Sequence, residues 1–447
     1  MRVINTNEPI ILFLGDILVL LVSLWLSLLL RYLEIPSLEV WTVHVYPFLI
    51  LFIVWIGIFY ISGLYEKHTS IFKNKIPVIL FNAQIVSIVI AVIFFYAFPI
   101  FSIAPKTILF IFGIISFGLF WSFRILGYSR FFKNKQHKTL LIGEGLEVND
   151  LYTEVNKNKH YELSFVHKIS AQEYVEHDYR AILEQKVKEG EIEVIVIDLR
   201  DKKNETILPA LYNLFLETIP VIDLLQVYED VFDKTPLSLV QYEWFMQYLS
   251  ISKKSIHDLG KRLLDILIAL SGLIVFALLF PIIFTAIKIE DPRGSIFISQ
   301  IRVGKNNRHI KIYKLRSMTR NEDGVWIGES TNQITRVGAF LRKSSIDEFP
   351  QFLNILKGDL SLIGPRPDMV GLESRLSQEI PYYAIRYIVK PGMSGWAQTR
   401  QDVIPNSIEE NKERLAYDLF YIKNRSLLLD VQIIIKTIKT LLTRGGR

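Results

Sequence analysis

Residues 263–287 read LLDILIALSGLIVFALLFPIIFTAI, an apolar run long enough to cross a bilayer. Basic residues prefer the cytoplasmic side of a membrane, and they flank both ends of this run: Lys253, Lys254, Lys261, Arg262, Lys288 and Arg293. Pro281 removes a backbone donor within the run and would kink a helix there. We therefore expect a re-entrant membrane helix, at about residues 262–287, that bends at Pro281 and returns. An ordinary fifth span is the alternative.

Four further apolar runs open the chain, at approximately Ile10–Leu30, Val45–Tyr65, Ile76–Phe98 and Thr107–Phe123. Three have the ~20 apolar residues that a membrane-spanning helix needs, and the fourth is near the lower limit. Basic residues lie before the first run, between the second and third, and after the fourth: Arg2, Lys67, Lys73, Lys75, Arg124, Arg130, Lys133, Lys135 and Lys138. The positive-inside rule then places both ends of the bundle in the cytoplasm. Because the runs hold little charge, residues 1–126 are expected to form an anchoring four-helix transmembrane bundle rather than a transporter.

The composition excludes several classes of protein. Of the 447 residues, 50 % are hydrophobic and 21 % charged, and the mean hydropathy is +0.29, which excludes a disordered chain. The chain has no cysteine, so disulfides, thiolate zinc sites and a cysteine nucleophile are excluded. The net charge of +6 is too small to indicate nucleic-acid binding, and no nucleic acid is expected as a partner.

Residues 138–250 have a soluble composition and predict a Rossmann-like α/β domain. Short apolar strands alternate with helix-like stretches, a pattern typical of a parallel sheet. The predicted strands are Thr139–Ile142, Leu163–Val166, Ile192–Asp198 and Pro220–Leu224, and the predicted helices are Val148–Lys157, Ala171–Lys188 and Glu205–Glu217.

The turn after the first predicted strand, Gly143-Glu144-Gly145, resembles part of a dinucleotide-binding motif. It lacks the third glycine, and Glu144 and Glu147 would repel a pyrophosphate. We therefore favour a domain that binds no nucleotide. Setting the spacing, binding a nucleotide sugar weakly and building a dimer are all compatible roles for it.

A concentration of positive charge follows the apolar run at 263–287. The segment Arg293–Lys343 contains eleven lysines and arginines. Basic and apolar residues alternate in His309–Leu315, which predicts a strand, and Gly304–Asn307 resembles a hairpin turn. Three interpretations are open: the charge holds anionic headgroups, binds an anionic substrate such as a nucleotide diphosphate, or forms a solvated face.

An adjacent pair of acids, Asp347 and Glu348, follows the basic segment in SSIDEFPQFLN at 344–354. At a helix start both carboxylates can border one pocket. The alternative is structural, since Ser345 and Glu348 match an S-x-x-E capping box. Arg342 before the pair and the Gly364-Pro365-Arg366-Pro367 turn after it favour chemistry, because flanking prolines would hold Arg366 rigidly as a phosphate clamp.

These motifs together resemble a known family, the monotopic phosphoglycosyl transferases, or bacterial sugar transferases. The resemblance covers about 256–442 and is carried by KRLLD at 261–265, QIRVG at 300–304, KLRSM at 314–318, LRKSSIDE at 341–348, KGDLSLIGPRP at 357–367 and PGMSGWAQ at 391–398. The bundle and the Rossmann-like domain resemble the large members, polyprenyl-phosphate hexose-1-phosphate transferases that begin exopolysaccharide, capsule or O-antigen synthesis. The expected fold is a four-span α-helical bundle, a Rossmann-like α/β domain and an α/β-type catalytic domain at 256–447 with the re-entrant helix.

The resemblance implies a reaction and a location. A nucleoside-diphosphate sugar, usually a UDP-sugar, gives its sugar phosphate to undecaprenyl phosphate and releases UMP. Asp347 would be the nucleophile, and Glu348 would contribute to Mg²⁺ binding. The protein would be a multi-pass homodimer of the bacterial inner membrane, in contact with its lipid, with the catalytic domain on the cytoplasmic face. The candidates for phosphate contact, with Arg366 and Arg316 first, are Arg302, Lys305, Lys314, Arg316, Arg342 and Arg366.

Other functions are open but less supported. A membrane-anchored regulatory protein that binds a nucleotide sugar or lipid would tolerate replacement of Asp347. A transporter would need more polar residues inside the spans. An NAD-dependent sugar epimerase or dehydratase would need a YxxxK pair, and no tyrosine between Gly145 and Ser250 has a lysine four residues later.

Overall fold

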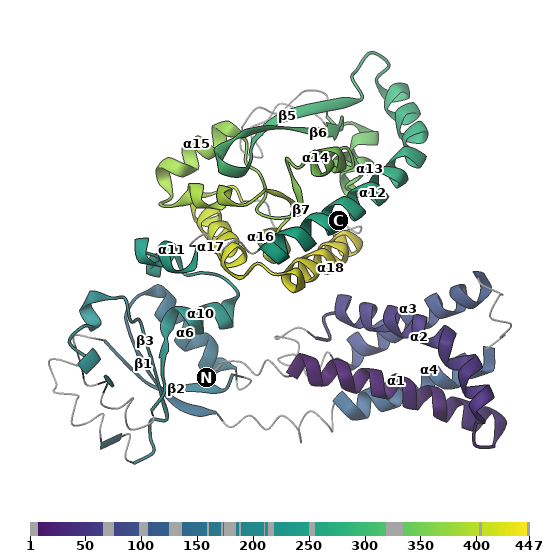
Figure 1. Cartoon of the computed structure of the whole chain (residues 1–447), viewed down its shortest axis with the longest axis horizontal. Helices are drawn as coiled ribbons and strands as arrows, with labels where there is room; N and C mark the ends of the chain where they lie inside the picture. Colours follow the sequence, from purple (N-terminus) through teal and green to yellow (C-terminus); the bar gives the residue numbers. More distant parts are fainter. Residues whose placement is uncertain are drawn as a thin grey trace. The chain divides into compact units, whose positions relative to one another are not determined.

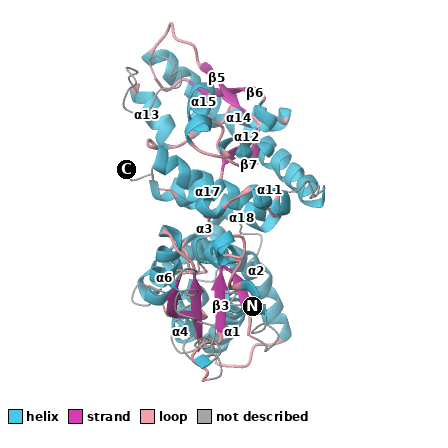
Figure 2. Ribbon diagram, turned by 90° about the vertical axis from the view of Figure 1, so that its left-hand side faces the viewer, coloured by secondary structure: helices cyan, strands magenta, loops and turns pink. Residues whose placement is uncertain are grey.

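The structure is a computed structural model that describes residues 8–65, 76–97, 106–124, 136–158, 161–170, 173, 185–186, 189–209, 211–212, 219–249, 255–318, 334–401 and 405–444. The chain divides into two compact units, 1–231 and 232–447. Helices predominate, and the strands are few and short (Figure 2). Several residues on which the sequence predictions rest lie outside the described part: Arg2, Lys67, Lys73, Lys75, Arg130, Lys133, Lys135, Lys253, Lys254, most of the helix expected at 171–188 and part of the helix expected at 205–217.

Four apolar helices open the first unit (Figure 1): α1 Glu8–Tyr32, α2 Leu38–Ile61, α3 Ile76–Ala97 and α4 Lys106–Ser122. They pack around buried side chains such as Leu24, Phe48, Trp55 and Phe112. Within the described residues, α1, α2 and α3 are long and apolar enough to cross a membrane, and α4 is shorter, as predicted. The fourth helix that meets this criterion is α12, which contains the apolar run at 263–287.

Several polar side chains inside this bundle are paired with one another. Arg124 Nη2 lies 2.5 Å from Asp16 Oδ2, and the Tyr65 hydroxyl donates to the same oxygen at 2.6 Å. Deeper in the bundle, Trp55 Nε1 donates to Gln84 Oε1 at 3.0 Å. Such pairing satisfies polar groups that lipid cannot hydrogen-bond, so these residues stabilise the helix packing.

The first unit also contains a four-stranded parallel sheet in the order β2-β1-β3-β4. Its strands are β1 His137–Ile142, β2 Leu163–Ile169, β3 Val194–Ile197 and β4 Val221–Asp223, close to the predicted positions. All of β3 is buried, as expected for a strand covered on both faces. The helical segments are α6 Leu146–Lys157, η4 Lys202–Asn204 and α10 Leu224–Phe232, which reaches the start of the second unit.

Gly145 in the glycine-containing turn has a structural reason to be glycine. It precedes α6 with φ of 113°, which side chains rarely adopt. The conformation of the chain therefore accounts for this glycine without a bound nucleotide.

The second unit begins at Phe232, so it includes residues up to 250 that we expected in the middle domain. Its strands form an antiparallel hairpin, β5 Phe297–Val303 with β6 His309–Leu315, and a parallel pair, β7 Ser361–Ile363 with β8 Gly392–Ser394. The predicted hairpin is thus confirmed. The helices are η5 Leu237–Leu239, α11 Tyr242–Tyr248, α12 Ser255–Glu290, η6 Lys305–Asn307, α13 Arg336–Lys343, η7 Ile346–Glu348, α14 Gln351–Lys357, α15 Val370–Glu379, η8 Tyr383–Ile388, α16 Trp396–Arg400, α17 Ile408–Asn424 and α18 Leu427–Arg444.

Helix α12 differs from the expected re-entrant helix in one respect. It runs as a single helix from Ser255 to Glu290 with Pro281 inside it, so the chain stays helical where we expected it to break. The helix is nevertheless not straight in Figure 1. A proline within an apolar helix is compatible with this, because local adjustment of the backbone can accommodate the missing donor.

Both ends of α12 are bonded to the second unit. Near the start, Asp265 Oδ1 accepts hydrogen bonds from Ser361 Oγ at 3.1 Å and Leu362 N at 2.8 Å. At the end, Glu290 accepts from the backbone amides of Arg336 and Val337 at 2.6 and 3.0 Å. One face of α12 is therefore held along the unit from end to end.

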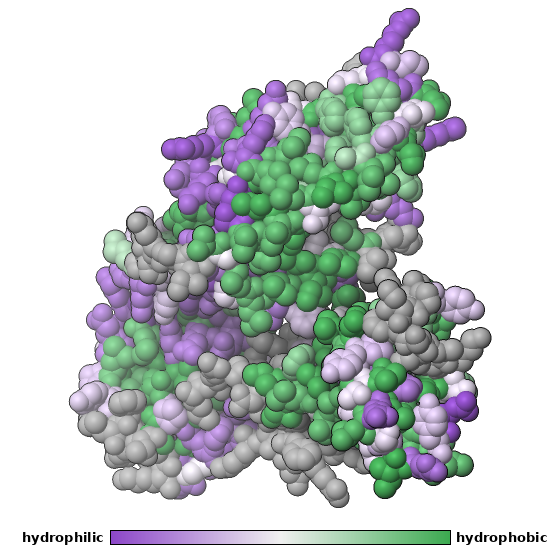
Figure 3. Space-filling view, turned by 45° about the vertical axis from the view of Figure 1, so that its right-hand side comes forward, coloured by the Kyte–Doolittle hydropathy of each residue, from purple (hydrophilic) through white to green (hydrophobic). Residues whose placement is uncertain are grey.

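The other face of α12 is apolar and exposed. Hydrophobic side chains form a broad area on this unit (Figure 3). On α12 they include Leu259, Leu263, Leu267, Ile274, Leu278 and Ile282, each more than half exposed. Helix α18 contributes exposed Leu428 and Ile438, while its Leu429 and Ile433 pack into the core. It thus packs on the second unit and still presents apolar side chains.

We predict that Gly392→Ala destabilises the second unit. A Cβ at Gly392 would lie 2.1 Å from the backbone nitrogen of Gly364, so β7 and β8 would have to separate. Such overpacking costs about 1–3 kcal/mol, which corresponds to an apparent Tm several degrees lower in thermal unfolding of the purified protein. Gly371→Ala is the control, since its Cβ would meet nothing within 4 Å. Equal Tm values for the two variants would contradict the close approach.

Candidate active site

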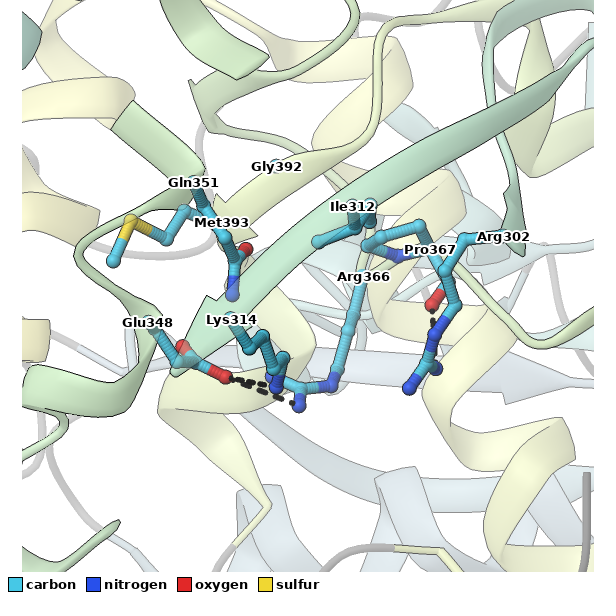
Figure 4. Close-up of a pocket in the computed structure, with 9 residues that line it drawn as sticks. All are labelled: Arg302, Ile312, Lys314, Glu348, Gln351, Arg366, Pro367, Gly392 and Met393. Carbon is cyan, nitrogen blue, oxygen red and sulfur yellow. Dashed lines mark hydrogen bonds and ion pairs between the residues drawn. The ribbon is translucent and has the colours of Figure 1, made fainter. Parts of the chain in front are cut away.

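A pocket in the second unit brings together residues from several segments (Figure 4). Strands β5 and β6 supply its basic wall, the segment from η7 to α14 supplies an acidic and an amide side chain, and the turn after β7 supplies an arginine. The pocket is lined by Arg302, Ile312, Lys314, Glu348, Gln351, Arg366, Pro367, Gly392 and Met393.

Glu348 is held by two cations in this pocket. Lys314 Nζ lies 2.7 Å from Glu348 Oε1, and Arg366 Nη2 lies 3.7 Å from the same oxygen. Burial opposes ionisation of Glu348, but the charges of Lys314 and Arg366 outweigh it and lower its pKa to about 2. Glu348 is therefore ionised at neutral pH.

The neighbouring carboxylate, Asp347, has the opposite tendency. Its side chain is buried, and burial together with the negative charge of Glu348 raises its pKa to about 6, although Lys314 partly offsets this. Two consecutive carboxyl groups thus have pKa values that differ widely. Such separation is common where two carboxyl groups perform different tasks.

The capping-box interpretation of Ser345 and Glu348 is wrong. Ser345 has φ of 56°, in the left-handed region, and its side chain does not cap η7. The carboxylate of Glu348 contacts Lys314 rather than the backbone of Ser345. Placing Ser345 in the left-handed region ends α13 and turns the chain so that the next residues reach the pocket.

Arg302 lies half-buried on the same wall of the pocket as Arg366. Its Nη1 donates to the carbonyl of Pro367 at 3.3 Å, and its Nη2 donates to Gln300 Oε1 at 2.8 Å. Burial and the charge of Arg366 lower its pKa to about 10, so it is still protonated at neutral pH. The crowding of these positive charges favours an anion between them.

The other predicted phosphate contacts lie elsewhere. Arg316 Nη2 lies 2.7 Å from Asp291 Oδ2, and Lys305 belongs to η6; neither lines the pocket. Arg342 is exposed and points to the sulfur of Met318, but its charge favours the ionised form of Asp347. The structure therefore brings together Arg302, Lys314 and Arg366 with Glu348.

Behind the pocket lies a buried ionic network that we did not predict. It centres on Asp368, which is paired with Arg386 and, at 3.0 Å, with Arg414. Both guanidinium groups also donate to the backbone carbonyl of Arg366, at 3.1 and 2.8 Å. Tyr383 donates to Asp368 as well. The network thus fixes the backbone of Arg366, which we had attributed to the flanking prolines alone.

A sequence signal for this network exists, although it is weak. Tyr383, Arg386 and Tyr387 follow the spacing of one helical face, and the two hydroxyls and the guanidinium all reach Asp368. Burial opposes ionisation of Asp368, but Arg386 and Arg414 outweigh it and hold its pKa far below the usual value. The carboxylate of Asp368 is therefore ionised at neutral pH.

We predict that Asp368→Asn strongly destabilises the second unit. The substitution removes the carboxylate that pairs with both Arg386 and Arg414, although Asp418 remains 2.7 Å from Arg386. Removing one partner of a buried ion pair typically costs about 3–5 kcal/mol. Denaturant or thermal unfolding of the purified protein measures the loss. Glu379→Gln is the control, because it breaks an exposed ion pair with Arg375 that is worth about 0–1 kcal/mol. Similar losses for both variants would show that the network is not a structural support.

The residues at the pocket fit Mg²⁺ only in a restricted sense. No group of three or more His, Cys, Asp or Glu residues suited to a metal occurs in the part of the chain that the structure describes. Mg²⁺ is, however, often bound by one or two carboxylates together with waters and substrate phosphates. Asp347 and Glu348 could supply those carboxylates once a diphosphate is present.

Comparisons with known proteins place the second unit in a family. The model of the bacterial sugar transferase family matches residues 256–444. The UDP-N-acetylgalactosamine-undecaprenyl-phosphate N-acetylgalactosaminephosphotransferase of Aeromonas hydrophila is 38 % identical over 262 residues, which cover 57 % of this chain and 60 % of that protein.

Two further relatives match over shorter stretches of this chain. The UDP-glucose:undecaprenyl-phosphate glucose-1-phosphate transferase of Caulobacter vibrioides is 40 % identical over 190 residues, 42 % of this chain and 71 % of that protein. The exopolysaccharide production protein PSS of Rhizobium leguminosarum bv. phaseoli is 38 % identical over 193 residues, 41 % of this chain and 96 % of that protein. These matches show that the chain belongs to the bacterial sugar transferase family, and its motifs and charged pocket agree with this.

Proposed function

We propose that this protein transfers a sugar 1-phosphate from a UDP-sugar to undecaprenyl phosphate and releases UMP. The printed names of the relatives support a donor of this kind and undecaprenyl phosphate as the acceptor. The observation that carries the proposal is the position of the buried Asp347 carboxyl group next to a pocket with three cations and one ionised carboxylate. That arrangement suits a nucleophile that must approach a diphosphate.

The proposed reaction has two displacements at one phosphorus. A carboxylate oxygen of Asp347 attacks the phosphorus that carries the sugar, and the bond from that phosphorus to the oxygen of UMP breaks. UMP leaves with the electron pair. An oxygen of the lipid phosphate then attacks the same phosphorus and breaks its bond to Asp347, which regenerates the carboxylate. Covalent catalysis divides the exchange between two bulky substrates into two steps.

In this reaction an anionic carboxylate attacks an anionic phosphate, and the cations of the pocket would reduce the repulsion between them. Lys314 and Arg366 would bind oxygens of the diphosphate, and these new contacts would replace part of their contact with Glu348. Arg302 would add a third positive charge. Glu348 would be a protein ligand of Mg²⁺, which when bound would neutralise further phosphate charge.

The attachment of α12 to the second unit supports a location of the site at the membrane surface. Because Asp265 and Glu290 tie both ends of α12 to the same unit, its apolar face can enter lipid while the pocket stays with the aqueous side. We propose on this basis that α12 is re-entrant and that the catalytic domain lies on the cytoplasmic face of the inner membrane. We also propose that the middle domain is Rossmann-like and that the protein is a homodimer. Both of these rest on the family resemblance alone.

We predict that Asp347→Asn abolishes UMP release. The amide cannot form the covalent intermediate, so release from UDP-glucose or UDP-N-acetylgalactosamine, with undecaprenyl phosphate and Mg²⁺, should fall by several orders of magnitude. Asp150→Asn is the matched control, since Asp150 is an exposed aspartate on α6. Lipid-dependent release by a folded Asp347→Asn variant would rule out the nucleophile and favour a binding or regulatory protein.

We predict that kcat/KM for transfer falls as the pH drops through about 6. The nucleophile is the ionised form of Asp347, whose pKa is raised to about 6, so protonation removes it below that pH. Arg342→Gln should move this fall to higher pH, because the charge of Arg342 favours the ionised carboxylate. A profile that is flat from pH 5 to 8, or that moves to lower pH in the variant, would contradict this role.

A further inference from the structure

Gln351 is the one uncharged polar side chain among the residues that line the pocket. Its side chain is 5 % exposed, and its amide points toward Glu348 and Lys314 (Figure 4). Among the described residues this amide has no hydrogen-bond partner. Because this amide faces the pocket, it is placed to donate to or accept from a ligand bound there.

The position of Gln351 in the chain places it over the carboxyl pair. It begins α14, three residues after Glu348 and four after Asp347, and side chains at these spacings share one face of a helical segment. A ligand group that meets the amide must therefore lie close to the phosphorus that Asp347 attacks under the proposed function.

Under the proposed function the three cations would bind the phosphate oxygens, so we look for the partner of Gln351 among the sugar substituents nearest to the transferred phosphate. The transferred phosphate is bonded to the sugar through the oxygen on C1, so the substituent on C2 is the ring hydroxyl or acetamido group nearest to that phosphate. The hydroxyls of the ribose and the edge of the base lie beyond the second phosphate. We propose that the Gln351 amide hydrogen-bonds the C2 substituent of the transferred hexose and thereby positions the sugar for attack.

An amide suits this position because it can both donate and accept. It would donate to the oxygen of a C2 hydroxyl or an acetamido group, or accept the O–H or N–H that either group carries. Gln351 would thus favour donors with a polar substituent at C2 over 2-deoxy sugars. This inference rests on the proposed function and adds a residue that selects among its donors.

The test combines a variant of the protein with a variant of the donor. Gln351→Met keeps the length of the side chain and removes the amide. With UDP-glucose, kcat/KM of the variant should fall about tenfold, in keeping with one lost hydrogen bond. With UDP-2-deoxyglucose, wild type and variant should react equally, because the group that Gln351 contacts is absent. UMP, used as a competitive inhibitor, should bind both proteins with the same affinity.

Three results would overturn the assignment. An equal loss with both donors would give Gln351 a structural role or a contact with the phosphates, and weaker UMP binding by the variant would place the contact on the nucleotide. No loss with either donor would mean that the amide contacts nothing. Gln378→Met is the control, since Gln378 is exposed on α15. Absence of transfer by wild type from UDP-glucose and UDP-N-acetylgalactosamine would instead refute the proposed donor, and this inference with it.

Discussion

The ion pair between Lys314 and Glu348 is the interaction on which the rest of the site depends. It joins the β5–β6 hairpin to the turn that carries the acidic pair, with 2.7 Å between the charged atoms. Without its cations, burial would favour the protonated form of Glu348; with them, Glu348 is ionised and leaves Asp347 beside a fixed negative charge. Burial of Asp347, together with this ion pair and the charge of Arg366 at Glu348, therefore separates the pKa values of two consecutive carboxyl groups and gives them different chemical characters.

The position of the cations depends in turn on structure outside the pocket. Arg366 is held through its own backbone carbonyl, to which Arg386 and Arg414 donate, while Gly364 and Gly392 allow the two strands beside it to approach closely. Positioning of this kind reduces the rearrangement needed when an anion binds, because the guanidinium is already placed. The buried network around Asp368 thus stabilises the second unit and also positions the backbone of Arg366.

Local sequence patterns were sufficient for much of the fold, and long-range contacts explain the rest. A pattern within one short segment predicts each of several elements that the structure contains. These are the apolar helices, the four strands of the parallel sheet and the hairpin that includes His309–Leu315. The grouping of Arg302, Lys314 and Arg366 followed from family motifs. Arg316 differs because its partner, Asp291, lies on the connection between α12 and β5, and no local pattern predicts such a pairing. Asp368 and Arg386 were missed for the same reason, since their contacts join separate segments.

Helix α12 is attached directly to the elements that bear the candidate site. Its exposed face is apolar along most of its length, but its opposite face contacts the elements that bear the site: Phe352 of α14 packs on Gly272, and Glu290 holds the first turn of α13. Helix α13 leads directly into the turn at Ser345 that positions Asp347. Under the proposed placement of α12 in lipid, a change in its depth would therefore move the acidic pair with it. Rigid attachment of this kind suits the proposed reaction, because the phosphate of a lipid acceptor stays at the depth that the bilayer fixes.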